Sequence, residues 1–367
     1  MSAKSLQATA YVTPRALLAG AAAREAVAAG WAWPLLGEGA YAAMEVSTRE
    51  NGSVTRLGAI VRTAYDKDAS AIPQGLRASI EMQMAALASK RGAFAGFDVS
   101  KPILMGVLNV TPDSFSDGGR FDSAEAAVAH GVALFEAGAA LVDVGGESTR
   151  PGAVPVGEHA EIARVVPVVK ALTTRGVPVS IDTRHAAVMA EAVAAGAKVI
   201  NDISALADAK SLAAAAKSGL PVVLMHMQGE PRTMQDNPTY VWAPGDIYDF
   251  LASRIAACVA AGIAKNRIAV DPGLGFGKTD DHNAAIMDHL AMFHGLGCAL
   301  VVGASRKGFI GRMSRGEAAK DRLAGSLAAA LHAAGQGAQI LRVHDVAETR
   351  QALAVARQLS AAHGPLT

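Results

Sequence analysis

Eight short apolar runs in this chain each end in polar or charged side chains. One Asp or Ser after such a run is explained by capping of a following helix. Eight such endings predict instead a polar site at a shared edge of a sheet. In chain order, the runs end in Asn109, GGESTRPG, Asp182-Thr183, Asn201-Asp202, Met225-His226, Asp271, Ser305-Arg306-Lys307 and Arg342-Val343-His344, and the second run also contains Asp143.

Three of these endings offer hydrogen-bonding edges suited to a flat heterocycle. Asp182, Asn201 and Asp271 carry carboxylate and amide groups. A carboxylate accepts two hydrogen bonds at once from a guanidine-like N–C–N edge. Arg306 and Lys307 add cationic donors. These residues predict a pocket for a planar, nitrogen-rich ring.

A second set of strand-end residues predicts a binding site for an anion. Arg342 and His344 end the last run and Asn109 ends the first, and these two strands are neighbours if the sheet closes on itself. Arginine, histidine and asparagine side chains together can hold a diphosphate. Two loops rich in Gly, Pro and Ser, 111–119 and 145–152, could close over a bound ligand.

Several other candidates have simpler interpretations. Asp143 lies inside an apolar run, which favours a buried structural acid bonded to loop backbone over a catalyst. His226 fits a core position and a pocket wall equally well. Met225 is expected to form pocket wall, since Met packs well against flat rings. We expect no function for four further histidines or for the two cysteines: His185, His282, His289, His294, Cys258 and Cys298.

The elements that must position these residues alternate regularly after residue 100. An Ala-rich helical stretch follows each apolar run, the last at 346–362, and continuous apolar runs are typical of parallel strands covered by helices. Eight such units predict an α/β fold, a closed (β/α)8 TIM barrel over 100–362, with an open doubly wound sheet as the alternative. The expected strands are 103–109, 140–145, 177–182, 198–203, 221–226, 267–271, 299–304 and 338–343.

Residues 1–95 lack this regular alternation and predict a small N-terminal α/β extension of unknown function. Helices are expected at 14–29, starting near Pro14, and at 76–90, with strands at 40–48 and 57–64. Asn51-Gly52 predicts the hairpin turn between those strands. Two hairpins lying on the main domain are the alternative, and 91–100 is expected to be a linker.

Composition narrows the class of protein. Lys+Arg total 34 and Asp+Glu 33, so the net charge of +1 argues against binding to nucleic acid or to an acidic membrane. Hydrophobic residues make up 51% of the chain, enough for a large core. Two separated cysteines exclude a disulfide framework or zinc ribbon, and no apolar run is long enough to span a bilayer. We therefore expect a cytoplasmic protein.

Nine segments of the sequence resemble dihydropteroate synthases, in that family's order, over roughly residues 100 to 360. The segments are MGVLNVTPDSFSDGG, VDVGGESTRPGA, SIDT, INDIS, LMHMQGEPRTMQ, DPGLGFGKT, VGASRKGFIG, RLAGSLA and RVHDV. The resemblance implies a (β/α)8 barrel that is usually dimeric. It also implies a transferase that joins 6-hydroxymethyl-7,8-dihydropterin diphosphate to p-aminobenzoate, giving 7,8-dihydropteroate and diphosphate. The resemblance further implies that Mg2+ is required and that sulfonamides inhibit this folate-pathway step.

The resemblance also assigns roles to residues of this chain. Asp182, Asn201, Asp271 and Lys307 would hold the pterin, with Met225 as wall and Arg342 stacked along it. Asn109, Arg342 and His344 would receive the diphosphate; Asn109 would bind Mg2+ with help from Asp113. The residues expected at the p-aminobenzoate pocket are Phe115, Thr149, Arg150, Pro151 and Gly308. Because Gly308 replaces a Ser found in some members, backbone N–H groups must serve there.

Two other functions remain open at this point. A methyltransferase that binds methyltetrahydrofolate would share the pterin-binding barrel, but it has no reason to keep STRPG, SRK and RVHD, and the chain has no cobalamin domain. A non-catalytic pterin-binding protein would bind the ring without turnover. The 100-residue extension departs from shorter family members and is expected to serve packing or oligomer contact.

Overall fold

The computed structural model describes residues 9–67, 72–110, 120–147 and 156–361. Eight parallel strands close into a barrel in the order β10-β11-β12-β5-β6-β7-β8-β9, which confirms the predicted architecture. The strands are β5 (Ile103–Asn109), β6 (Leu141–Gly145), β7 (Val179–Asp182), β8 (Val199–Asp202), β9 (Val222–Met225), β10 (Ile268–Asp271), β11 (Ala299–Val302) and β12 (Ile340–Val343).

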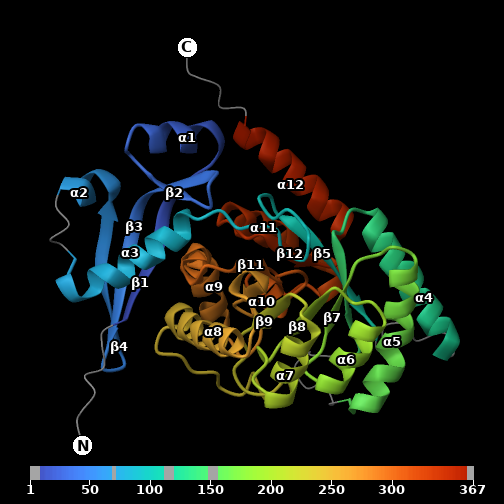
Figure 1. Cartoon of the computed structure of the whole chain (residues 1–367). Helices are drawn as coiled ribbons and strands as arrows, with labels where there is room; N and C mark the ends of the chain where they lie inside the picture. Colours follow the sequence, from blue (N-terminus) through green and yellow to red (C-terminus); the bar gives the residue numbers. More distant parts are fainter. Residues whose placement is uncertain (1–8, 68–71, 111–119, 148–155, 362–367) are drawn as a thin grey trace, which may run out of the picture.

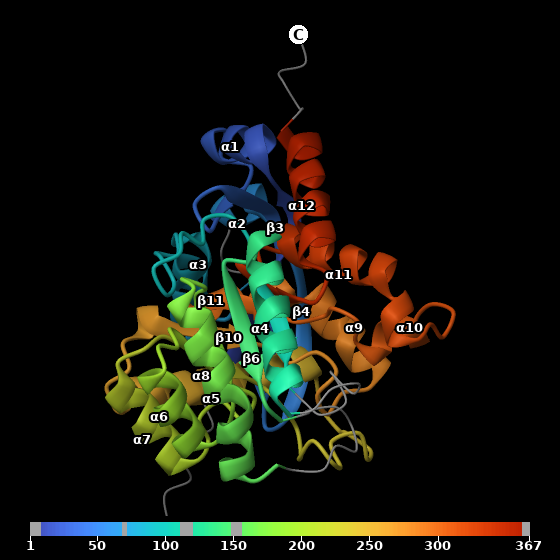
Figure 2. The same cartoon turned by 90° about the vertical axis from the view of Figure 1, so that its right-hand side faces the viewer.

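Helices surround the barrel and alternate with its strands (Figures 1 and 2). They are α4 (Arg120–Glu136), α5 (Glu158–Thr174), α6 (Ala186–Ala194), α7 (Ala209–Ser218), α8 (Ala243–Ala260), α9 (Asp280–Asp288), α10 (Gly308–Arg312), α11 (Leu323–Gly335) and α12 (Val346–Ala361). Short 3-10 turns lie at η3 (Lys265–Arg267), η4 (Leu290–Leu296) and η5 (Ala319–Asp321). Within the described residues no helix is both long and apolar enough to cross a bilayer.

Local sequence explains where several of these helices begin and end. Asp208 accepts a hydrogen bond from the Ser211 N–H and caps α7, which ends at Gly219 with φ of 66°. Thr279 and His282 form a reciprocal capping box at the start of α9. These caps fix the first residues of α7 and α9 and the end of α7.

The alternation of side chains along each barrel strand makes two layers inside the barrel. Residues two apart face the same side. The lower layer is apolar and contains Met105, Leu141, Val199, Val223, Ala269, Val301 and Ile340. Phe94 and Val99 are buried against this layer, so the segment 91–100, expected only as a linker, also closes the lower end of the barrel. The next inward positions carry the polar groups of the predicted site.

The N-terminal extension is a four-stranded antiparallel sheet with three helices (Figure 1). Its central strand, β3, pairs with β1 on one side and with β2 and β4 on the other. Asn51 and Gly52 form the β3–β4 turn with φ of 50° and 80°, as predicted. The elements are β1 (Thr9–Leu18), α1 (Gly20–Ala28), β2 (Trp33–Leu35), β3 (Gly39–Glu50), β4 (Ser53–Val61), α2 (Arg62–Lys67) and α3 (Gln74–Ala88).

The helix predicted over 14–29 is wrong in its first part. Residues up to Leu18 belong to β1, which pairs with β3 from Thr9 to Leu18, and only Gly20–Ala28 is helical. Pro14 is tolerated because β1 is an edge strand, where a missing N–H costs little. On the outer edge of β1, the side chain of Gln83 accepts from the Val12 N–H and donates to the Ala10 carbonyl, so α3 covers that edge.

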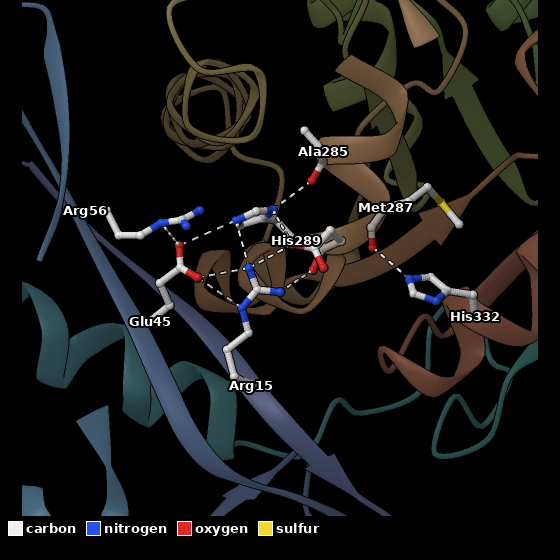
Figure 3. A network of polar contacts seen from close by, with 8 residues as sticks. Arg15, Glu45, Arg56, Ala285, Met287, His289 and His332 are labelled. Atoms are coloured by element: carbon white, nitrogen blue, oxygen red, sulfur yellow. Dashed lines mark hydrogen bonds and ion pairs between the residues drawn. The ribbon is translucent and has the colours of Figure 1, made fainter. Parts of the chain in front are cut away.

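Polar contacts join the extension to the barrel at the end of α9 (Figure 3). Arg15 of β1 pairs with Glu45 of β3 and with the Asp288 carboxylate at 2.8 Å, and it donates to the Asp288 carbonyl. Arg15 also donates to Nε2 of the buried His289, whose Nδ1 donates to the Ala285 carbonyl. His289 therefore has a structural role in this contact.

Candidate active site

A pocket opens at the carboxyl ends of the barrel strands. Most of its polar lining comes from inward positions of the strands, which the period-two alternation brings together. Lys307 joins them from the turn before α10. The lining residues are Asp182, Asn201, Ile203, Met225, Asp271, Gly273, Leu274, Phe276, Gly303, Lys307 and Arg342. All six residues predicted to bind the pterin are in this set.

Arg342 joins the two sides of the pocket. Its Nε donates to Oδ2 of Asp143 at 2.6 Å, and a terminal nitrogen donates to Oδ2 of Asp182 at 2.8 Å. Burial acts to lower the pKa of Arg342, but the Asp143 and Asp182 carboxylates outweigh burial and raise it. The guanidinium is therefore charged and held in one orientation, as binding of an anion requires.

Asp143 has a more specific role than the sequence indicated. It is fully buried, as predicted, but its partners are side chains and not loop backbone. Oδ2 accepts from Arg342 and also from Nδ2 of Asn201 at 3.0 Å, while Oδ1 has no partner among the described residues. Asp143 thus orients two pocket residues without lining the pocket.

The two pocket carboxyls are perturbed by burial. Burial raises the pKa of Asp182 to about 7, against the lowering effect of Arg342. Burial likewise raises the pKa of Asp271, although its Oδ1 accepts from the Gly273 N–H at 2.7 Å. A bound ring that donates N–H groups would replace lost water and favour the charged carboxylates. Both groups can therefore act as hydrogen-bond acceptors for such a ring.

Lys307 lines the same pocket as these acids. Its Nζ is 3.8 Å from the centre of the Phe276 ring, within range of a cation–π contact. Burial, together with the Arg342 cation, lowers the pKa of Lys307 to about 7. A lysine with this pKa can donate a hydrogen bond to a carbonyl oxygen or ring nitrogen of the ligand.

An apolar wall completes the pocket. Met225 packs with Ile203, Met234 and Phe276 in one buried cluster. A Cβ added at Gly273 would lie 1.9 Å from the His226 carbonyl oxygen, and φ there is +68°. Only glycine fits at this crossing, which holds the loop after β10 against the end of β9.

The predicted diphosphate residues lie at the ends of adjacent strands. Asn109 is the last residue of β5, which pairs with β12, and His344 follows the end of β12. The Nδ1 of His344 is 3.1 Å from Oγ of Ser305. Burial and the Arg342 cation lower the pKa of His344 to about 3, so its imidazole is neutral in the free protein.

The predicted p-aminobenzoate and second metal positions fall largely outside the described residues. These positions are Asp113, Phe115, Thr149, Arg150 and Pro151. Gly308 is described and is the first residue of α10, directly after Lys307. The predicted roles of these residues therefore stay predictions.

A buried lysine was missed by the sequence analysis. Lys278 is 0% exposed, and its Nζ lies 2.9 Å from Nδ1 of His226 and 2.9 Å from the Phe276 carbonyl oxygen. Burial lowers the pKa of Lys278 well below its usual range and that of His226 to about 2. His226 is therefore a core histidine that helps to hold the loop carrying Phe276. The charged GFGK ending was the one signal in the sequence.

One further group of side chains could in principle hold a metal. Ligand atoms of Glu147, Glu161 and His185 all lie within 4.8 Å of one another. However, His185 pairs with Glu161 at 2.7 Å and Arg184 pairs with Glu147 at 3.3 Å. Each carboxylate of this group therefore already has a side-chain partner within the protein, and the group serves as an internal polar cluster.

Comparison with known proteins identifies the family. Residues 105–344 match the model of the family described as pterin binding enzyme. The dihydropteroate synthase of Escherichia coli K12 is 49% identical over 259 residues, which cover 70% of this chain and 92% of that relative. The corresponding enzyme of Neisseria meningitidis serogroup B is 47% identical over 265 residues, with the same coverage of 70% and 92%.

Solved structures agree with this result. The Yersinia pestis dihydropteroate synthase in a sulfonamide drug complex has 50% identity and a TM-score of 0.69, over 72% of this chain and 97% of that one. The Xanthomonas albilineans dihydropteroate synthase in complex with 7,8-dihydropteroate has 45% identity and a TM-score of 0.66, over 72% and 95%. By sequence and by fold, the chain belongs to the dihydropteroate synthases, within the pterin binding enzyme family.

Proposed function

We propose that the chain catalyses the dihydropteroate synthase reaction. It condenses 6-hydroxymethyl-7,8-dihydropterin diphosphate with p-aminobenzoate and releases 7,8-dihydropteroate and diphosphate. The observation that carries this proposal is the polar layer of the barrel. There Asp182, Asn201, Asp271, Lys307 and Arg342 line one pocket, and Asn109 and His344 lie at the ends of the adjacent strands β5 and β12.

The pterin ring would bind flat against Met225 with its guanidine-like edge facing the acids. Asp271 or Asp182 accepts from that edge, and Asn201 and Lys307 supply the complementary donors. These polar groups are buried in the free pocket and have few partners of their own. A ring that makes hydrogen bonds with them therefore gains more binding free energy than it would at a hydrated site. This favours a ligand with several N–H and carbonyl groups over an apolar one.

The diphosphate would extend from the ring past Arg342 toward Asn109 and His344. A diphosphate beside His344 favours its protonated form and raises its pKa, so His344 can take up positive charge when the substrate arrives. The amide oxygen of Asn109 is a hard ligand that fits Mg2+, with phosphate oxygens and water as the remaining ligands and Asp113 as a further candidate. Bound Mg2+ would neutralise charge on the diphosphate.

The reaction proceeds by dissociative substitution at the pterin methylene. The bond between the methylene carbon and the diphosphate oxygen breaks first, and its electron pair leaves with the diphosphate. The electron-rich dihydropterin delocalises the resulting cation, while Arg342 and His344 hold the leaving anion. The amine of p-aminobenzoate then forms the new C–N bond and loses a proton. No protein nucleophile is required, and both cysteines are buried and free.

The p-aminobenzoate would bind beside the methylene. Phe115, Thr149, Arg150 and Pro151 are the candidates for closing this site, and the backbone after Lys307 at Gly308 is the candidate for its carboxylate. Competition by a sulfonamide against p-aminobenzoate would test this arrangement, because a sulfonamide imitates that substrate. We further propose that the protein acts in the cytoplasm as a homodimer, which sedimentation at working concentrations would test.

Diphosphate release by the purified protein is the test of the activity. The assay contains dihydropterin diphosphate, p-aminobenzoate and Mg2+, with an Arg342→Ala variant as control. Release that depends on p-aminobenzoate and Mg2+, yields dihydropteroate and disappears in the variant supports the proposal. Pterin binding without release would overturn it in favour of a non-catalytic binder, and methyl transfer from methyltetrahydrofolate would favour the methyltransferase function.

A further inference from the structure

The extension holds the first turns of α8 through two residues on adjacent strands. Tyr11 of β1 is fully buried, and its hydroxyl donates to Oδ2 of Asp249 at 2.7 Å. Arg49 of β3 donates to the same oxygen at 3.0 Å and pairs with Asp246 through its other terminal nitrogen. One arginine thus bridges two acids on successive turns of α8.

Asp246 also fixes the chain that leads into α8. Its Oδ2 accepts from the backbone N–H groups of Val241 at 2.8 Å and Trp242 at 3.3 Å. The Trp242 ring meets the Tyr11 ring edge to face, with the centroids 5.4 Å apart. The end of the segment 226–242 is therefore set by contacts from the extension.

The same segment reaches the pocket at its other side. The hydroxyl of Tyr240 donates to the Gly277 carbonyl at 2.7 Å, and Nε2 of Gln235 donates to the Gly275 carbonyl at 2.8 Å. Met234 is 3% exposed and packs in the cluster that forms the apolar wall with Phe276. A continuous series of contacts thus connects β1 and β3 of the extension to the pocket wall.

We propose that the N-terminal extension positions the pterin site, with Arg49 as the positioning residue. Arg49 acts through Asp246 and the segment 226–242, which supports the wall and the loop that carries Phe276. The inference rests on the proposed function, because it concerns binding of the pterin. It gives a role to a part of the chain that lies outside the matched family region, which begins at residue 105.

The geometry allows the role of Arg49 to be separated from docking of the extension as a whole. The cluster of Arg15, Glu45 and His289 at the end of α9 is a second anchor that an Arg49 variant leaves in place (Figure 3). A matched control is Arg91, which donates to the carbonyls of His294 and Cys298 near the lower end of the barrel, away from the pocket. Loss of Arg91 therefore weakens packing without reaching the segment 226–242.

The experiment compares full-length wild type with Arg49→Met, Arg49→Lys, Tyr11→Phe and Arg91→Met. Calorimetric titration gives the Kd for 6-hydroxymethylpterin, and steady-state kinetics give KM for both substrates. Hydrogen exchange reports on the amides of Val241 and Trp242. We expect Arg49→Met to raise the pterin Kd and KM about fivefold or more, to speed exchange at both amides, and to leave KM for p-aminobenzoate unchanged.

The remaining variants make the result decisive. Arg49→Lys restores part of the pterin affinity, since one ammonium can pair with one of the two acids. Tyr11→Phe keeps the ring and loses the hydrogen bond to Asp249, so it should raise the pterin Kd by a smaller factor. This variant tests the inference if Arg49→Met does not fold. An unchanged Kd in Arg49→Met, or an equal increase in Arg91→Met, overturns the inference. Absence of pterin binding in wild type overturns the proposed function instead.

Discussion

Replacement of Asp143 by Asn tests the internal architecture of the site. The change keeps the shape of the side chain and removes its charge. The Asn carbonyl can still accept from Arg342 and Asn201, but its NH2 group then occupies the place of Oδ1, which has no partner among the described residues. The guanidinium of Arg342 loses one of its two carboxylate partners and keeps Asp182.

The expected magnitude follows from this geometry. Removing one partner of a buried ion pair costs about 3–5 kcal/mol. Since Arg342 keeps one carboxylate and the Asn oxygen still accepts, we expect the free energy of unfolding to fall by about 2–3 kcal/mol. Arg342 and Asn201 are then less firmly oriented, and we expect kcat/KM to fall about tenfold to a hundredfold, which corresponds to about 1.4–2.7 kcal/mol.

Urea unfolding and the diphosphate-release assay measure these two effects on the same preparation. Asp98→Asn is the matched control, because Asp98 is exposed and bonds only within its own turn to Ser100. The control should change stability by less than about 0.5 kcal/mol. If Asp143→Asn changes stability by less than about 1 kcal/mol and leaves pterin affinity and kcat/KM unaltered, Asp143 does not orient the site.

Three further predictions concern the pocket. Lys307→Met should abolish measurable pterin binding in calorimetry. In the wild type the pKa of folded Lys307 is lowered to about 7, so the unfolded state binds more protons above that pH and the free energy of unfolding rises from about pH 7 toward pH 10.5. A variant whose free energy of unfolding has the same pH dependence would contradict this. Gly273→Ala should lower the free energy of unfolding in urea by more than about 3 kcal/mol, because the added Cβ would lie 1.9 Å from a backbone carbonyl oxygen. Gly92→Ala should leave this free energy nearly unchanged, since no atom lies within 4 Å of its added Cβ. Arg342→Lys should lower kcat/KM at least about a hundredfold, because one ammonium cannot reproduce the two-sided contact with Asp143 and Asp182; near-normal turnover would refute that requirement.

The barrel and the chemistry of its pocket could be predicted from the sequence because both depend on local patterns. Eight apolar runs of strand length separated by helices specify the closed sheet. Alternation along a strand then places Asn201 above Val199 and Asp271 above Ala269, on the inner face. Once the fold is known, the residue types at these positions already indicate a planar, nitrogen-rich ligand.

The secondary structure of β1 could not be predicted in the same way. The local sequence of residues 14–18 predicts a helix, yet these residues pair with β3 over twenty residues further along the chain. Pairing with a distant strand and the cover from Gln83 outweigh local helix propensity, which is worth less than about 1 kcal/mol per residue. Stabilisation by a distant strand cannot be predicted from the neighbouring residues in the sequence.

The sequence by itself determined the barrel, the family and the identity of the polar residues that line the pocket. Tertiary structure alone decided which of these residues support one another: Asp143 with Arg342, Lys278 with His226, and Arg49 with Asp246. The separations in these pairs run from tens of residues to about two hundred, so no spacing rule connects them. The physical reason is that periodicity fixes the direction of a side chain, whereas its partner is fixed only when distant elements pack together.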